Sequence, residues 1–280
     1  MPILKLRGVC VRPIDVYKKM RREIQSIYRS RLQVQILLSL GEKNQTLSEI
    51  REITNSTSQA VLPKIRKLQA QHLIEASNYE YRLTPLGDIV RTKIEDFVLS
   101  VGVINRHRDF WATHFLEGIP QPFLSGIGNL QNSDLVSDTN VDIFQVYSHF
   151  LNMVKDAGWI HGITSIMSVG HADSLAHRIL ENTPVELVVS PNVIEKLREE
   201  PYAEMLRTLA PHKEFKVLVV HEPLKVGITV TDKALSLGLY KKDGVTYDTT
   251  TDLFSSDPRA ITWGEGLFSF YRDRAEQVTF

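Results

Sequence analysis

The chain has 280 residues, and its 33 Lys and Arg balance 33 Asp and Glu, so it carries no net charge. An apolar fraction of 42% and a charged fraction of 24% are ordinary for a globular protein and argue against a disordered or fibrous chain. No apolar run approaches the roughly 18 residues needed to span a membrane. The single cysteine, Cys10, excludes an internal disulfide framework and a multi-cysteine zinc site, and it favours a reducing cytoplasm.

The two halves of the sequence differ in charge. Residues 1–108 hold 19 Lys and Arg against 10 Asp and Glu, a net +9, whereas residues 109–280 hold 14 against 23, a net −9. A basic front half fits the electrostatic footprint of a nucleic-acid-binding domain. The acidic rear half is better suited to contacts with something other than DNA.

The first residues, MPILKLRGVCVRP, lack the apolar core of a signal peptide. We interpret this start as a tail or short strand, with Met20 as a candidate native start. A basic helix is predicted over residues 14–28. The apolar run Arg31–Leu40 follows and ends at Gly41, a residue that favours helix termination, so it predicts the first core helix of the next domain.

Two capping boxes follow in close succession. Thr46 with Glu49 predicts the start of one helix, and Ser56 with Gln59 predicts the start of the next, because a hydroxyl and a Glu or Gln three residues later satisfy the first free amides. A tight turn at Asn55 separates the helices. Helix, short turn and helix are typical of a helix-turn-helix.

The second of these helices, over residues 56–71, has two faces. Val61, Ile65 and Leu68 form a buried stripe, and the opposite face has short polar side chains first and cations later. That order suits a recognition helix in a major groove, although an ordinary amphipathic helix with a solvated face is the alternative. The predicted base contacts are Ser56, Thr57, Gln59 and Ala60, and the predicted phosphate contacts are Lys64, Arg66 and Lys67.

A β-hairpin is predicted next, from alternating runs over 73–75 and 79–83 around a turn at 76–78. Tyr81 or Arg82 on this wing would reach the DNA backbone or the minor groove. Thr84 and Pro85 then predict the start of a long helix that ends near His107. Its apolar face is too broad for a winged domain alone, so it is either covered by the second domain or forms a homodimer seam: Ile89, Ile94, Phe97, Val98, Val101 and Ile104.

The rear half predicts an α/β domain. Apolar strands over 159–169, 185–190 and 215–221 alternate with helices over 172–180 and 192–209, which indicates a sheet with parallel neighbours. A hairpin is predicted over 226–240, a helix over 142–156 and a last helix over 258–277. The fold class is therefore α+β: tail 1–20, winged helix-turn-helix 21–108, helical connector 109–157, and an α/β effector or partner domain 158–280 with a mixed, partly parallel sheet.

Polar residues follow the predicted parallel strands, where open α/β sheets bind ligands. Ser168, His171, Ser190 and His221 are the candidate ligand-binding residues of a small-molecule pocket, and the alternative is that the serines only cap helices. No cofactor or metal is predicted. G-x-S-x-G, Walker, H-E-x-x-H and G-x-G-x-x-G motifs are absent from the sequence, so we do not expect an enzyme.

Several runs of the sequence resemble a known family. DFWATHFLEGIPQPFL, VELVVSPNVIEKL and AITWGEGLFSFYRDRAEQV resemble the middle-to-C-terminal domain of archaeal winged-helix regulators, the methanogenesis (filamentation-linked) regulatory proteins found chiefly in methanogens. STSQAVLPKIRKLQAQHLI and YRLTPLG resemble their DNA-binding half. The resemblance implies a dimeric, sequence-specific transcription factor with an effector or partner domain, and a proline at position 63 shared by the family.

The rear domain also loosely resembles the phospholipase-D-like effector domain of sugar-responsive archaeal regulators. Phospholipase D catalysis requires an H-x-K motif, whereas here His212 and Lys213 are adjacent and no H-x-K occurs, which implies a non-catalytic domain. We therefore predict a cytoplasmic regulator of transcription that binds double-stranded DNA as a homodimer, responds to a small-molecule effector and has no membrane partner. An adaptor whose winged helix contacts protein is the alternative, and a hydrolase with a vestigial front domain is a third interpretation.

Overall fold

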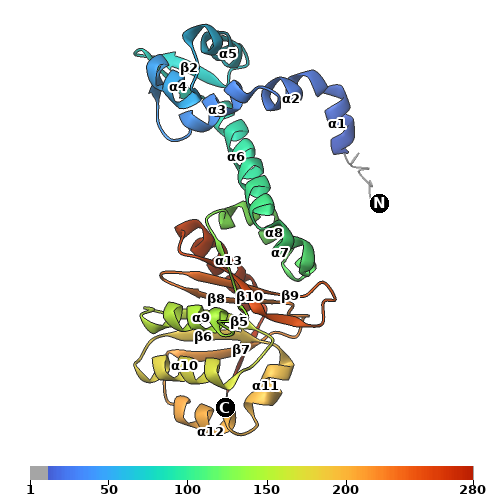
Figure 1. Cartoon of the computed structure of the whole chain (residues 1–280), viewed down its shortest axis with the longest axis vertical. Helices are drawn as coiled ribbons and strands as arrows, with labels where there is room; N and C mark the ends of the chain where they lie inside the picture. Colours follow the sequence, from blue (N-terminus) through green and yellow to red (C-terminus); the bar gives the residue numbers. More distant parts are fainter. Residues whose placement is uncertain (1–11, 280) are drawn as a thin grey trace, which may run out of the picture. The chain divides into compact units, whose positions relative to one another are not determined.

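The computed structural model describes residues 12–279 in two compact units that divide between Phe97 and Val98 (Figure 1). The division falls inside helix α6 (Pro85–Arg106), whereas the sequence placed the boundary after residue 108. Residues 1–11, which include Cys10 and most of the predicted tail, lie outside the described residues. No helix in the described part of the chain is long and apolar enough to cross a membrane.

The basic segment at the start of the first unit forms two helices rather than the single predicted one. Helix α1 (Pro13–Lys19) and helix α2 (Arg21–Tyr28) are separated at Met20, whose φ of −105° and ψ of 22° depart from helical geometry. The last residues of the predicted tail are therefore helical. Neither helix contains a fully buried residue.

Three helices and a small sheet form a winged helix in the first unit. The helices are α3 (Arg31–Leu40), α4 (Leu47–Thr54) and α5 (Ser58–Ala70), and the antiparallel sheet has the order β1-β3-β2, from β1 (Gln45–Thr46), β2 (Ile74–Ser77) and β3 (Glu80–Leu83). The core that they share includes the predicted stripe of α5, which is thereby confirmed, and Ile94 of α6. Its buried side chains include Ile36, Leu37, Ile50, Val61, Ile65, Leu68 and Ile94.

The cap of α4 is the one predicted from sequence. Thr46 Oγ1 accepts from the Glu49 amide at 3.3 Å, and Glu49 accepts from the Thr46 amide at 2.8 Å. The ammonium of Lys43 and these bonds from Thr46 lower the pKa of Glu49 to about 2. At the other end Asn55 is left-handed with a φ of 46°, a conformation that asparagine tolerates, and this ends the helix.

The predicted second capping box is wrong by one residue. Thr57, not Ser56, caps α5, because its Oγ1 accepts from the Ala60 amide at 3.4 Å. Ser56 instead donates to the Thr54 carbonyl at 3.1 Å, within the turn that follows Asn55. With Ala60 at the third helical position, no side chain can reach back, so the reciprocal half of the box is absent.

The wing turns at Asn78 and Tyr79, one residue beyond the predicted turn. Both have positive φ, 50° and 65°, as a two-residue type I′ hairpin turn requires. Thr84 then caps α6 as predicted, since its Oγ1 accepts from the Gly87 amide at 3.0 Å.

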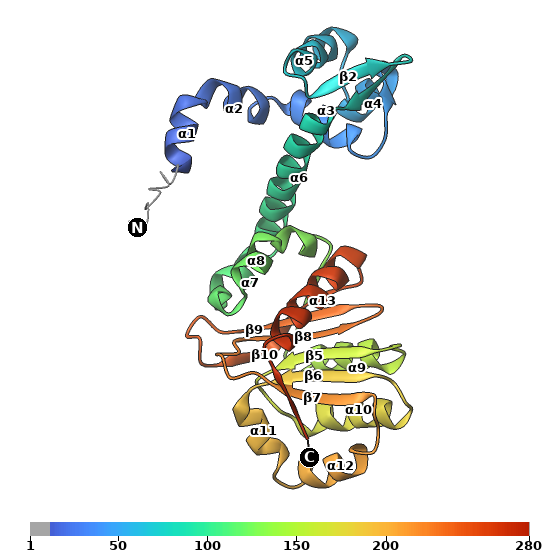
Figure 2. The same cartoon turned by 180° about the vertical axis from the view of Figure 1, so that it is seen from behind.

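An eight-stranded mixed sheet organises the second unit (Figure 2), in the order β11-β7-β6-β5-β8-β9-β10-β4. Strands β5, β6 and β7 are parallel, and the remaining neighbours are antiparallel, which confirms the predicted mixed and partly parallel sheet. The strands are β4 (Asp134–Ser137), β5 (Ile160–Thr164), β6 (Val185–Val189), β7 (Phe215–Val219), β8 (Val226–Thr231), β9 (Leu235–Tyr240), β10 (Tyr247–Ser255) and β11 (Glu276–Val278).

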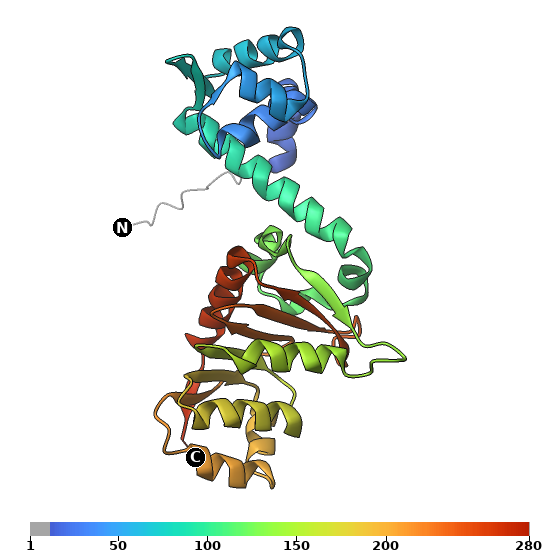
Figure 3. The same cartoon turned by 60° about the vertical axis from the view of Figure 1, so that its left-hand side comes forward.

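Helices cover both faces of this sheet (Figure 3). On one face lies α13 (Pro258–Arg272), whose Trp263, Leu267 and Phe268 pack with side chains of β8 and β9. On the other face lie α9 (Gln145–Lys155), α10 (Val169–Leu180), α11 (Pro191–Leu197) and α12 (Tyr202–Leu209). Because successive side chains of a strand point to opposite faces of the sheet, neighbouring residues of one strand pack against different helices.

The rear half departs from the sequence prediction at three places. The predicted helix over 192–209 is broken before Pro201, because a residue preceding proline disfavours helical geometry. The last helix ends at Arg272, and the following residues form β11. Within the predicted connector, α7 (Arg108–Thr113), α8 (Gln121–Ser125) and two 3₁₀ turns precede β4, an edge strand paired with β10 that the sequence did not indicate.

Candidate nucleic-acid interface and candidate ligand pocket

The exposed face of α5 carries most of the predicted DNA-contacting residues. Val61, Ile65 and Leu68 hold the helix on the core. The opposite side leaves these predicted residues exposed: Thr57, Gln59, Ala60, Arg66 and Lys67. Ser56 and Lys64 are half-buried at the edge of this face. Pro63, also exposed, lacks the amide that would bond the Gln59 carbonyl.

The cations of α5 are free of intramolecular partners within the described residues. The ion pairs of the first unit use Arg12, Lys43, Arg82, Arg91 and Lys93 as their cations. None of them involves the basic residues of α5, so those charges face solvent unpaired. An unpaired, exposed cation can neutralise a phosphate without first breaking a protein contact.

The exposed side chains of the wing include the predicted Arg82 and one tyrosine that was not predicted. Tyr81 is half-buried against the core of the winged helix, and Arg82 is paired with Glu75 at 2.7 Å. Tyr79, at the turn, is 99% exposed and was not singled out from the sequence. The signal that could have found it is the Asn-Tyr pair between two alternating runs, since asparagine favours the first position of a type I′ turn.

The apolar face predicted on α6 is only partly buried. Ile94 belongs to the core of the winged helix, while Leu86, Ile89 and Phe97 are 57%, 62% and 56% exposed. The ring of Tyr28 packs edge-on against Phe97 with centroids 6.0 Å apart. Val98, Val101 and Ile104, further along the helix, are exposed as well.

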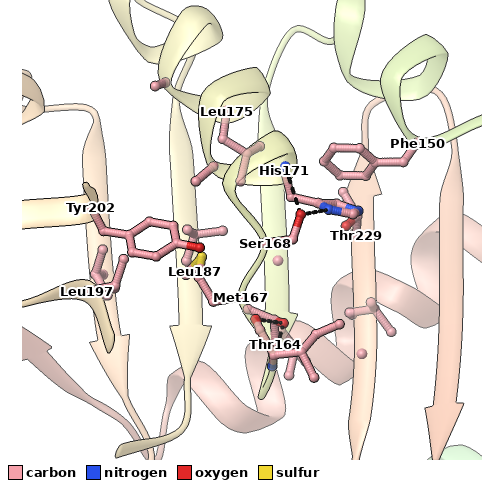
Figure 4. Close-up of a pocket in the computed structure, with 18 of the residues that line it drawn as sticks. Phe150, Thr164, Met167, Ser168, His171, Leu175, Leu187, Leu197, Tyr202 and Thr229 are labelled. Atoms are coloured by element: carbon pink, nitrogen blue, oxygen red, sulfur yellow. Dashed lines mark hydrogen bonds between the residues drawn. The ribbon is translucent and has the colours of Figure 1, made fainter. Parts of the chain in front are cut away.

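Ser168 and His171 lie together in a cavity of about 150 Å³ in the second unit (Figure 4). Ser168 caps α10: its Oγ lies 2.9 Å from His171 Nδ1 and accepts from the His171 amide at 3.4 Å. Phe150 of α9 packs against the imidazole with ring centroids 4.5 Å apart. Burial lowers the pKa of His171, so its ring is neutral at physiological pH.

The other two predicted ligand-binding residues do not line this cavity. Ser190 caps α11 without a side-chain bond, and His221 is exposed after β7. The cavity instead runs under α10 toward the antiparallel strands β8, β9 and β10. The prediction considered only the ends of the parallel strands, whereas the cavity is lined along the length of β5, β6 and β7 and also by β8, β9 and β10.

Several polar residues of the cavity were missed from the sequence, among them Ser236 on β9, and Tyr247 and Asp252 on β10. Ser236 donates to Asp252 Oδ2 at 2.8 Å. Burial raises the pKa of Asp252 to about 6 and raises that of Tyr247 above its usual range. Gly227 and Gly238 leave the space that Tyr247 fills, because a Cβ at either position would overlap its hydroxyl.

No group of three or more His, Cys, Asp or Glu within residues 12–279 is arranged to hold a metal ion. The residues that line the cavity offer hydrogen bonding, burial of apolar surface and the charge of one carboxylate. Hydrolysis uses a nucleophile and a base that a third residue orients. Ser168 and His171 are paired, but within residues 12–279 no third residue is hydrogen-bonded to the other imidazole nitrogen.

The fold and these surfaces define a winged-helix protein with an appended mixed α/β unit. The chain belongs to the methanogenesis regulatory protein FilR1 family: residues 21–102 match the FilR1 N-terminal domain, and residues 143–274 match the FilR1 middle domain. It is 24% identical over 265 residues to the methanogenesis regulatory protein FilR1 of Methanothrix harundinacea (strain 6Ac), over 93% of this chain and 59% of that protein. The resemblance seen in the sequence is confirmed, and the chain spans less than two thirds of this relative.

Solved structures give weaker matches. TrmBL2, an archaeal chromatin protein, is 14% identical with a TM-score of 0.43, over 93% of this chain and 99% of its own. Nuc, a phospholipase D family member from Salmonella typhimurium, is 8% identical with a TM-score of 0.41, over 53% of this chain and 98% of its own. The phospholipase-D-like character of the second unit stays a prediction.

Proposed function

We propose that this protein regulates transcription by binding specific sequences of double-stranded DNA through α5. The observation that carries the proposal is the solvent-facing side of α5, where polar side chains precede unpaired cations. The regulatory character of the FilR1 family supports it. The charge distribution supports it too, because residues 1–97 hold 17 Lys and Arg against 10 Asp and Glu.

In this proposal the first turn of α5 enters the major groove. Gln59, with Ser56, Thr57 and Ala60 beside it, meets base edges, and glutamine can bond adenine through two atoms. The three basic residues Lys64, Arg66 and Lys67 meet phosphates. On the wing, the exposed Arg82 meets the DNA backbone once its bond to Glu75 is exchanged, whereas the half-buried Tyr81 supports the wing from beneath.

The test is selection of genomic fragments by the purified protein, followed by affinity measurement over a salt series. Arg66→Ala should weaken binding to every sequence and lower the slope of log affinity against log salt by about 1 per protomer. Gln59→Ala should instead reduce the preference for the selected site. Arg198→Ala, an exposed arginine of the second unit, is the matched control and should change neither quantity.

Equal losses on all sequences for Arg66→Ala and Gln59→Ala would contradict these assignments. Absence of any DNA shift at low salt would favour the adaptor, in which the winged helix contacts protein.

We further propose that the protein is a homodimer and that the second unit senses a small molecule. The exposed apolar side chains of α6 support the first statement, and the cavity beside α10 supports the second.

A further inference from the structure

The walls of the cavity differ sharply in polarity. One wall is mostly apolar and comes from α9, α10, α12 and the parallel strands, with Phe150, Leu175, Leu187 and Leu206 among its side chains, although Thr164, Ser168 and His171 also belong to it. The other comes from β8, β9 and β10, whose residues on this face are small or polar: Gly227, Thr229, Ser236, Tyr247 and Asp252. A ligand that satisfies both walls must have an apolar body and a polar end.

The polar wall contains a carboxylate without a counter-ion. Asp252 accepts one bond from Ser236, and none of the described residues that line the cavity is a lysine or an arginine. The carboxylates of Asp248 and Asp138 raise the pKa of Asp252 further, whereas the imidazole of His114, which pairs with Asp248 at 3.3 Å, lowers it. His171, across the cavity, is neutral. A carboxylate held in an apolar cavity without a cation is costly, so a cationic ligand would gain from occupying the site.

We propose that this cavity binds a small amine, with its apolar body between α10 and the sheet and its ammonium group at Asp252. Tyr247 and Ser236 lie beside that carboxylate, and the Tyr247 hydroxyl has no hydrogen-bond partner within residues 12–279, so it is free to accept a second N–H of the ammonium. A cavity of about 150 Å³ is of the size that holds a benzene-sized molecule. This inference deepens the sensing role given to the second unit and rests on that part of the proposed function.

The inference is tested by measuring the affinities of four probes of similar size for the full chain in the absence of DNA. Calorimetry or ligand-observed NMR at pH 7.5 gives these affinities. Benzylamine, benzyl alcohol, toluene and benzoate share a ring and differ in the polar end. Benzylamine should bind about tenfold or more tighter than benzyl alcohol and toluene, because only it pairs with the carboxylate. Benzoate should not bind.

Two variants locate the binding. Asp252→Asn should reduce the affinity for benzylamine by about tenfold or more and leave that for toluene unchanged. Leu175→Trp should fill the apolar part and abolish binding of both, with circular dichroism confirming the fold. Asp173→Asn, on the exposed side of the same helix α10, is the control and should change nothing.

The proposal is overturned if benzyl alcohol binds as well as benzylamine, if Asp252→Asn leaves benzylamine affinity intact, or if no amine binding appears at millimolar concentration. Because DNA is absent from these measurements, any of these results leaves the DNA-binding proposal standing. Loss of DNA binding would in turn leave the amine result interpretable.

Discussion

At the scale of single residues, Asp252 has the clearest consequence for stability. Burial raises its folded-state pKa to about 6, above the usual value of 3.8, so the folded protein binds more protons than the unfolded chain between these values. The free energy of unfolding therefore falls as the pH rises through this window on account of this group. Asp252→Asn, always neutral, should be more stable than the parent at pH 7.5 by up to about 3 kcal/mol.

Chemical denaturation at pH 7.5 and near pH 4 checks this prediction, and the difference between variant and parent should shrink toward zero at the lower pH. Asp173→Asn serves again as the exposed control. A variant less stable than the parent at neutral pH would mean that a cation compensates the carboxylate in the folded state, and the cavity would then lack the unpaired charge that an amine requires.

Whether a residue could be predicted depended on how local its determinants are. Thr46, Asn55, Ser168 and Thr84 act within a few residues of themselves, through caps and turns, and the sequence indicated all four. Asp252 reaches the cavity only because β10 pairs with β9 and shifts register between Tyr247 and Asp252. No local pattern contains that information, so the carboxylate was missed.

At the scale of elements, the wing turn contains a strained residue that a glycine would relieve. Tyr79 has a φ of 65° and its side chain is 99% exposed, so it contributes strain to the fold and no packing. A left-handed non-glycine residue costs about 1–2 kcal/mol, and glycine recovers this less about 0.5–1 kcal/mol of backbone entropy. Tyr79→Gly should therefore stabilise the hairpin slightly, seen as slower amide exchange in β2 and β3.

The same substitution should weaken DNA binding if the wing touches the duplex, because it removes the aromatic side chain at the tip. Asn78→Gly is the matched control: it relieves the neighbouring positive φ and keeps Tyr79. Equal DNA affinities for the parent and both variants would show that the wing tip stays away from DNA.

Helices and strands were predicted where the apolar periodicity agrees with the capping and turn residues. They were missed where a strand depends on pairing with a segment distant in the sequence. The helices of the winged unit and the strands β5 to β9 follow from apolar spacing and caps. Strand β10 is rich in threonine and aspartate, and the edge strand β4 pairs with it from more than one hundred residues away. Their strand character comes from a partner that the sequence does not identify.

At the scale of the whole molecule, the exposed apolar side chains of α6 predict a dimer. Ile89 is 62% exposed and makes little contribution to its own fold, so Ile89→Glu should leave unfolding unchanged and convert a dimer into a monomer. Light scattering after size exclusion measures the mass. Val245→Glu, at a position 76% exposed in the second unit, is the control and should stay dimeric.

The monomer–dimer equilibrium can also be followed through the slope of log DNA affinity against log salt concentration. A two-fold dimer places two copies of α5 on two half-sites about 34 Å apart, so a selected site should be palindromic. Arg66→Ala then removes two phosphate contacts in the dimer and one in the Ile89→Glu monomer, which lowers the salt slope by about 2 and about 1 respectively. A slope change of about 1 in both backgrounds would mean that only one copy of α5 engages DNA, and the apolar face of α6 would then need a different partner.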